Sequence, residues 1–99
     1  MKFELNTTRE VAQTLAKRLK HTRLLKKWKR STLARRSGVS ESTLRRFEQT
    51  HKISLDNFLK LLLTLGRLDE MNQLLQPPPA KSIQDIERRH QKIPKRGSL

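Results

Sequence analysis

The chain predicts an all-α fold, because its apolar residues recur at helical spacing and turn residues separate the helical segments. Val11, Leu15 and Leu19 lie one turn apart in the first such segment. Gly38 separates two short amphipathic segments, and the leucines after Ile53 follow helical periodicity without forming a longer repeat. A chain of 99 residues has room for one modest core, so we expect five small helices in one domain.

The first helix is expected over residues 8–26. Thr7 followed by Glu10 forms a capping box at its start. Its apolar positions continue into Leu24 and Leu25, and together they form a narrow aliphatic stripe along the helix.

Apolar and aromatic residues also flank this helix. Phe3 and Leu5 either pack onto its start or form a short extended arm that pairs with a partner chain, and the sequence leaves both interpretations open. Trp28, the only tryptophan, is expected to fill the junction of three short helices.

The second helix is expected over residues 30–37. Ala34 is small enough to let two helices cross closely, and Gly38 supplies the left-handed conformation that ends the helix. Val39 is then expected to point inward from the turn.

The third helix is expected over residues 41–49, with Ser40 as its N-cap. Leu44 and Phe47 fall one turn apart on its buried face. The polar residues that face elsewhere are Glu41, Ser42, Thr43, Arg45, Arg46 and Gln49. A short helix that is apolar beneath and polar above has the chemistry that the major groove of DNA requires.

The fourth helix follows a loop over residues 50–53, is capped by Ser54 and is ended by Gly66. Its expected inward stripe is Leu55, Phe58, Leu59, Leu62 and Leu65. A fifth short helix carries further apolar residues, and five small helices cannot bury so many leucines in a monomer. The surplus predicts a dimer interface made of Leu61, Leu63, Leu68, Met71, Leu74 and Leu75.

Three prolines, Pro77 to Pro79, divide the chain into two parts. We expect a DNA-binding and dimerisation domain over residues 7–76 and a Pro-rich linker with a basic, flexible tail over residues 77–99. Ser82 and Asp85 form a capping pattern in this tail, which predicts a helix that forms on binding.

The formal net charge of +14 points to a polyanionic partner. Between Glu10 and Glu41 the chain has no acidic residue, so we expect one strongly positive wall. The basic residues of this stretch are Lys17, Arg18, Lys20, Arg23, Lys26, Lys27, Lys29, Arg30, Arg35 and Arg36. Nucleic acid is favoured over a membrane surface, because the aliphatic stripe of the first helix lacks the Trp or Phe of interfacial helices.

Composition also disfavours other functional classes. Cysteine is absent, and His21, His51 and His90 are far apart, so we expect neither a metal nor another cofactor and no enzymatic activity. The first residues lack the apolar core of a signal peptide, which predicts a cytoplasmic protein. Few aromatic residues are present, which disfavours a single-stranded RNA module.

A pattern of apolar, small and hydroxyl residues with defined spacing runs through residues 19–66. It consists of Leu33, Ala34, Gly38, Val39, Ser40, Ser42, Thr43, Leu44, Phe47, Glu48, Ser54 and Leu55. In identity and spacing this signature resembles the Xre or Cro/C1-type helix-turn-helix domain, a five-helix, lambda-repressor-like bundle of phage repressors, bacterial regulators and antitoxins. Two positions depart from this signature. Ser37 stands where the family prefers an apolar residue, and Lys29 stands where the family prefers a Ser or Thr cap.

The resemblance implies roles for individual residues. The third helix enters the major groove of a pseudo-palindromic operator that a homodimer binds, and Glu41 and Ser42 are its first base readers. Arg45 and Arg46 follow, one of them suited to a guanine and the other free to hold a phosphate. Glu48 is assigned a structural role. The full DNA-binding set is Arg30, Ser40, Glu41, Ser42, Thr43, Arg45, Arg46, Gln49 and Lys52.

Within the family the chain is most similar to the small HipB-type antitoxins, over residues 45–56 and in its Pro-rich exit and basic tail. That similarity implies an autorepressor encoded beside a HipA-like kinase toxin. Two alternatives stay open, which are a phage-type or free-standing repressor and a partner-binding protein with secondary DNA contact. The tail over residues 81–99 either docks a partner or adds nonspecific affinity for DNA.

Overall fold

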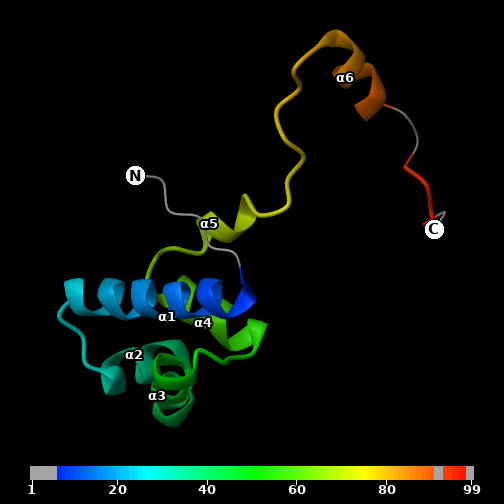
Figure 1. Cartoon of the computed structure of the whole chain (residues 1–99). Coiled ribbons are helices and arrows are strands. Elements are labelled where there is room, and N and C mark those ends of the chain that lie inside the picture. Colours follow the sequence, from blue (N-terminus) through cyan, green and yellow to red (C-terminus); the bar gives the residue numbers. More distant parts are fainter. Residues whose placement is uncertain (1–6, 91–92, 98–99) are drawn as a thin grey trace, which may run out of the picture.

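Six helices make up the computed structural model, which describes residues 7–90 and 93–97. They are α1 (Thr8–Leu25), α2 (Arg30–Ser37), α3 (Glu41–Thr50), α4 (Leu55–Thr64), α5 (Asp69–Asn72) and α6 (Ile83–Arg89). In Figure 1, α1 lies across the bundle with α2 and α3 beneath it, and α6 stands away from the bundle at the end of an extended segment. The predicted all-α fold is confirmed. Phe3 and Leu5 lie outside the described residues.

Side-chain caps explain why the helices begin where the sequence predicts. The Thr7 hydroxyl accepts the backbone N–H of Glu10 and donates to its carboxylate, which confirms Thr7 as the N-cap and pairs it with Glu10. Ser40 and Ser54 accept the backbone N–H groups of Thr43 and Asn57 in the same way. α2 instead follows Lys29, whose side chain has no acceptor atom for a cap.

The buried core joins α1 to α4. It consists of Ala16, Leu19, Leu33, Val39, Leu44, Phe47, Leu61 and Leu65, with Trp28, Ile53, Phe58 and Leu62 packed against it. In α1 the inward residues are thus Ala16, Leu19 and the next residue one turn on, Arg23. The predicted aliphatic stripe lies mostly at the surface, since Val11, Leu15, Leu24 and Leu25 are all exposed.

The inward face of α4 also differs from the prediction. Leu61, which the sequence assigned to a dimer interface, is fully buried at 0 % exposure, whereas Leu55, expected inside, is 65 % exposed. The face that packs on the core is formed by Phe58, Leu61, Leu62 and Leu65. Its direction is set by the position of α2 and α3, so Leu61 has no surface to offer a second subunit.

The predicted fifth helix is shorter than its apolar pattern. α5 holds only four residues and ends at Asn72. Leu75 has a positive φ of 62° and is 95 % exposed, which takes the chain out of the helical conformation. Arg67 donates to both carboxylate oxygens of Glu70 beside this turn.

The tail contains the helix that the sequence expected only on binding. α6 forms in this structure of the single chain, with the Ser82 hydroxyl accepting the backbone N–H of Asp85. Its two isoleucines, Ile83 and Ile86, are both exposed. Figure 1 shows α6 well separated from α1 to α4.

Candidate nucleic-acid interface

The turn between α2 and α3 is built from three consecutive residues. Gly38 has φ 78°, the left-handed conformation expected at the end of α2, and its N–H donates to the Ala34 carbonyl at 3.0 Å. Val39 is buried and Ser40 caps α3. The predicted helix-turn-helix geometry is therefore present.

Ser37 shows how the turn accommodates a polar residue where the family prefers an apolar one. Its hydroxyl donates to the Ala34 carbonyl at 3.3 Å and accepts the Val39 N–H at 3.1 Å. Both bonds satisfy the hydroxyl locally, so this departure from the family pattern leaves the turn intact.

The inner side of α3 is anchored by two residues. Leu44 and Phe47 are buried, and the Phe47 ring meets the Phe58 ring of α4 edge to face with centroids 5.8 Å apart. This packing turns the opposite side of α3 toward solvent.

A buried ion cluster fixes α3 relative to α1 and α2. One carboxylate oxygen of Glu48, Oε1, accepts from Arg23 Nη2 at 3.3 Å and from Arg30 Nε at 3.2 Å. Arg23 Nη1 also donates to the carbonyl of Trp28 at 2.9 Å. The structural role predicted for Glu48 is thus confirmed, because its carboxylate joins three successive elements.

Sequence reasoning missed two features of the region where α1, α2 and α3 meet. Arg23 was counted with the surface charges, yet it is buried, and the signal that could have found it is its place one turn beyond Leu19 on the inward face of α1. Trp28 lies against the core as predicted, but its ring also carries the Arg36 guanidinium 4.6 Å from its centroid and the Lys26 ammonium at 5.4 Å.

The outer side of α3 presents a row of polar groups. Glu41, Ser42, Arg45, Arg46 and Gln49 are all exposed. Arg45 Nη2 lies 3.6 Å from Glu41 Oε1, an exposed i,i+4 ion pair that must rearrange before both groups can contact bases. These side chains stand on a helix whose inner side is tightly held.

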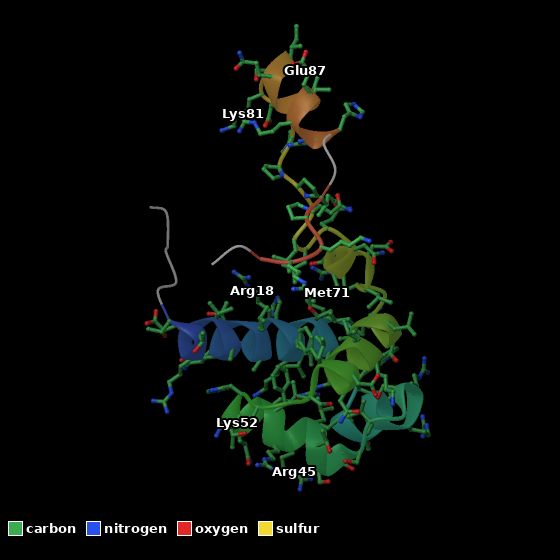
Figure 2. The ribbon with its side chains drawn as sticks, turned by 90° about the vertical axis from the view of Figure 1, so that its right-hand side faces the viewer. Arg18, Arg45, Lys52, Met71, Lys81 and Glu87 are labelled. Atoms are coloured by element: carbon green, nitrogen blue, oxygen red, sulfur yellow. The ribbon has the colours of Figure 1, made fainter. Side chains whose placement is uncertain are left out.

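A second group of the predicted residues meets at the edge of α3. Thr43, Arg46 and Lys52 line one open hollow of about 350 Å³, together with Ile53 and Ser54. Two cationic side chains and a hydroxyl around one hollow suit a phosphate oxygen. Figure 2 shows Lys52 and Arg45 on the same side of the domain, with Arg18 on the opposite side of α1.

The remaining two members of the predicted set have other partners. Ser40 Oγ accepts the Thr43 N–H and donates to Thr43 Oγ1 at 2.7 Å, so this hydroxyl is engaged within the cap. Arg30 Nε is bonded to Glu48, and the Arg30 side chain is 35 % exposed.

Most of the basic residues between Glu10 and Glu41 are exposed. Arg23 is buried and Arg30 is half-buried, while the other basic residues of the stretch are exposed. Figure 2 places Arg18 on the opposite side of α1 from Arg45, so Arg18 cannot contact the duplex that Arg45 would reach. The net charge of +14 favours association with a polyanion.

Within residues 7–90 and 93–97, no group of three or more His, Cys, Asp or Glu side chains is arranged to hold a metal ion. Across the same residues, no helix combines the length and apolar character that crossing a membrane requires.

Comparison with known proteins agrees with this geometry. A family model described as helix-turn-helix matches residues 19–70, which run from the second half of α1 into α5 and include the whole α2–α3 unit. A search of curated proteins finds no match. Because the match spans more than half of the chain and the α2–α3 unit has the expected turn, the protein belongs to the Xre/Cro-type helix-turn-helix family of DNA-binding regulators.

Proposed function

We propose that the protein is a sequence-specific transcriptional repressor that reads double-stranded DNA with α3. The observation that carries this proposal is the two-sided character of α3. Its inner side is held by Leu44, Phe47 and the Glu48 cluster, while its outer side is a continuous row of exposed polar groups. A helix held in this way can present base-reading groups in a defined register.

The proposed roles of Arg45 and Arg46 differ. Arg45 lies one turn from Glu41 on the outer side, where it can reach a guanine edge once the ion pair opens. Arg46 shares its hollow with Thr43 and Lys52, which suits a phosphate. We therefore assign base reading to Glu41, Ser42 and Arg45, and backbone contact to Thr43, Arg46 and Lys52, with Gln49 and the exposed part of Arg30 at the periphery.

The proposed operator is a pseudo-palindrome bound by a homodimer, with half-sites about 34 Å apart. Residues 7–76 form the proposed DNA-binding and dimerisation domain. Support for a second subunit comes from apolar side chains around α5, since Leu63, Leu74 and Leu75 are exposed and Leu68 and Met71 are half-buried. Leu61 is no longer part of this interface.

The finer proposal is a HipB-like antitoxin that represses its own operon and binds a HipA-like kinase toxin. It is supported by α6, an exposed helix with Ile83 and Ile86 at i,i+3 beyond three prolines. A free-standing repressor would need no such apolar surface. In an Ile83→Ser, Ile86→Ser variant, we expect unchanged operator affinity and loss of toxin binding, and unchanged toxin binding would contradict docking through α6.

The function is tested by binding of the purified chain to its own promoter and to scrambled DNA at near-physiological salt. We expect a preference of roughly 10³ or more for the promoter. Arg45→Ala should reduce discrimination at one base pair by about 5- to 150-fold, which corresponds to ~1–3 kcal/mol.

Two further variants separate reading from electrostatics. Arg46→Ala should weaken binding to both DNAs alike and reduce the salt slope by about 0.9. Arg18→Ala is the matched control, because Arg18 lies on the opposite side of α1 from Arg45. It should change neither the preference for the promoter nor the salt dependence of binding appreciably. Equal binding of the wild-type chain to both DNAs would refute the proposed function.

A further inference from the structure

Among the described residues, two atoms of the buried ion cluster have no hydrogen-bond partner. They are Nε of Arg23, a donor, and Oε2 of Glu48, an acceptor. The Arg23 side chain is 6 % exposed and the Glu48 side chain 3 % exposed, so bulk water does not compensate for the unused bonds. A donor and an acceptor that both stay unpaired in one buried cluster are costly, which indicates that something holds them apart.

The two atoms belong to groups that already face one another. Nη2 of Arg23 donates to Oε1 of Glu48 at 3.3 Å, and Nε lies beside Nη2 on the same edge of the planar guanidinium. Nη1 donates to the Trp28 carbonyl at 2.9 Å, which restrains the orientation of the plane. Arg23 therefore offers Glu48 the two parallel N–H groups of a bidentate pair, but only one of them is used.

Arg30 explains why the bidentate pair is incomplete. Its Nε donates at 3.2 Å to Oε1 of Glu48, the same oxygen that accepts from Arg23. The two arginines thus share one carboxylate oxygen, and the other oxygen stays without a bond. In the alternative arrangement, Oε2 accepts from Arg23 Nε and the bond from Arg30 is given up.

This exchange leaves the number of hydrogen bonds to Glu48 unchanged. The carboxylate accepts one bond from each arginine in the structure, and it would accept two bonds from Arg23 in the alternative. The alternative also pairs both unused atoms, and parallel N–H···O bonds to a carboxylate are among the stronger ones in proteins. The positive charge of Arg30 favours the observed arrangement, so an anion that competes for Arg30 would favour the alternative.

Arg30 is placed where such an anion can reach it. It is the first residue of α2, and its side chain is half-buried, in contrast to the buried Arg23. Its contact with Glu48 is made through Nε, and the terminal nitrogens of an arginine form a fork that suits a phosphate. The proposed function already places the exposed part of Arg30 at the periphery of the DNA contact.

We propose that Arg30 leaves Glu48 for a DNA phosphate when the operator binds, and that Glu48 then closes on Arg23 as a bidentate pair. This proposal rests on the proposed function, because a duplex held by α3 supplies the phosphate. Arg30 thus acts as a positioning residue in the free protein and as a DNA contact in the complex. Glu48 braces α3 in both states, since its bond to Arg23 is kept.

Nuclear magnetic resonance of the Arg23 Nε–H group tests the exchange without DNA. In Arg30→Met, Glu48 has lost its second arginine, and we expect the Arg23 Nε–H to exchange with water about tenfold more slowly than in the wild type. Arg35→Met removes an exposed charge from the same helix and is the matched control, with an unchanged rate. An unchanged rate in Arg30→Met, as a water bridging the two atoms would give, or equal slowing in both variants, would overturn the proposal.

The same signal tests the exchange in the complex. Promoter DNA should slow the Arg23 Nε–H of the wild-type chain to the rate of Arg30→Met, and it should slow that variant no further. Arg30→Met should also reduce the salt slope of binding by about 0.9, the value for one phosphate, and Arg35→Met should leave it nearly unchanged. Specific promoter binding with an unmoved Arg23 signal would overturn the exchange and leave the proposed function standing. Failure of the wild-type chain to prefer its promoter would refute both.

Discussion

The helix-turn-helix and the segment from α5 onward are held in opposite ways. Leu33, Val39, Leu44 and Phe47 of the helix-turn-helix are buried, and Glu48 joins α3 to two arginines. α5, by contrast, is four residues long, and every described residue of α6 is exposed or half-exposed. A surface that must read bases in register requires rigid support, whereas a surface that adapts to another protein does not.

The largest effect on the rigid support of the helix-turn-helix is expected from Glu48→Ala. It leaves Arg23 buried without its carboxylate, and we expect a loss of about 3–5 kcal/mol in the free energy of unfolding. Urea denaturation measures the change. Lys60→Gln removes a partner from the exposed Asp56–Lys60 pair and serves as the control, with an expected loss below about 1 kcal/mol. Equal losses would show that the buried cluster does not brace α3.

Two leucines of α4 sharpen the comparison between core and surface. Leu61→Ala should destabilise the monomer by about 2–5 kcal/mol, because its side chain is fully buried. Leu63→Glu, at a position 64 % exposed, should leave unfolding of the monomer nearly unchanged and weaken both dimerisation and operator binding. Sedimentation and urea denaturation separate the two effects, and a stable dimer of the Leu63 variant would exclude Leu63 from the interface.

A smaller effect is expected at the end of the reading helix. His51 caps α3 with φ 65°, a left-handed conformation that is costly for residues other than glycine. His51→Gly should therefore stabilise the fold by about 1 kcal/mol. Thr50→Gly, one residue earlier and within α3, is the control and should destabilise it by about 0.3 kcal/mol. A loss of stability in the His51 variant would contradict this assignment.

The smallest effect is expected beside α5. Hydrogen bonding and the charge of Arg67 lower the pKa of the exposed Glu70 carboxyl below its ordinary value, so its contribution to stability is present at neutral pH and lost as pH falls through the lowered pKa. Glu70→Gln should lower Tm slightly at pH 7 and not at about pH 2. The same difference in Tm at both pH values would rule out this ion pair as the cause.

The features that the sequence predicted well are those determined by neighbouring residues. Thr7, Ser40 and Ser54 cap their own helices, so the starts of α1, α3 and α4 follow from local patterns. Gly38 likewise ends α2 through its own conformation. Such interactions depend on chain segments only a few residues long.

The features that the sequence missed depend on how the helices pack. Periodicity defines a stripe on α4 but not the direction it faces, which is why Leu61 and Leu55 were placed on the wrong sides. The contact between Arg23 and Glu48 joins residues 25 positions apart. Which of Arg45 and Arg46 lines the hollow with Lys52 also depends on the path of the link between α3 and α4, so composition alone left it open.

The corner between α1 and α2 gives the protein a built-in optical probe. Trp28 is the only tryptophan and tyrosine is absent, so the near-ultraviolet emission of the chain arises from one indole. That ring packs against the core beneath Arg36. The backbone carbonyl of Trp28 accepts a hydrogen bond from Arg23 of the buried cluster. Any loosening of α1 from the helix-turn-helix brings water to the indole, so its fluorescence shifts to the red when the bracing of α3 is lost.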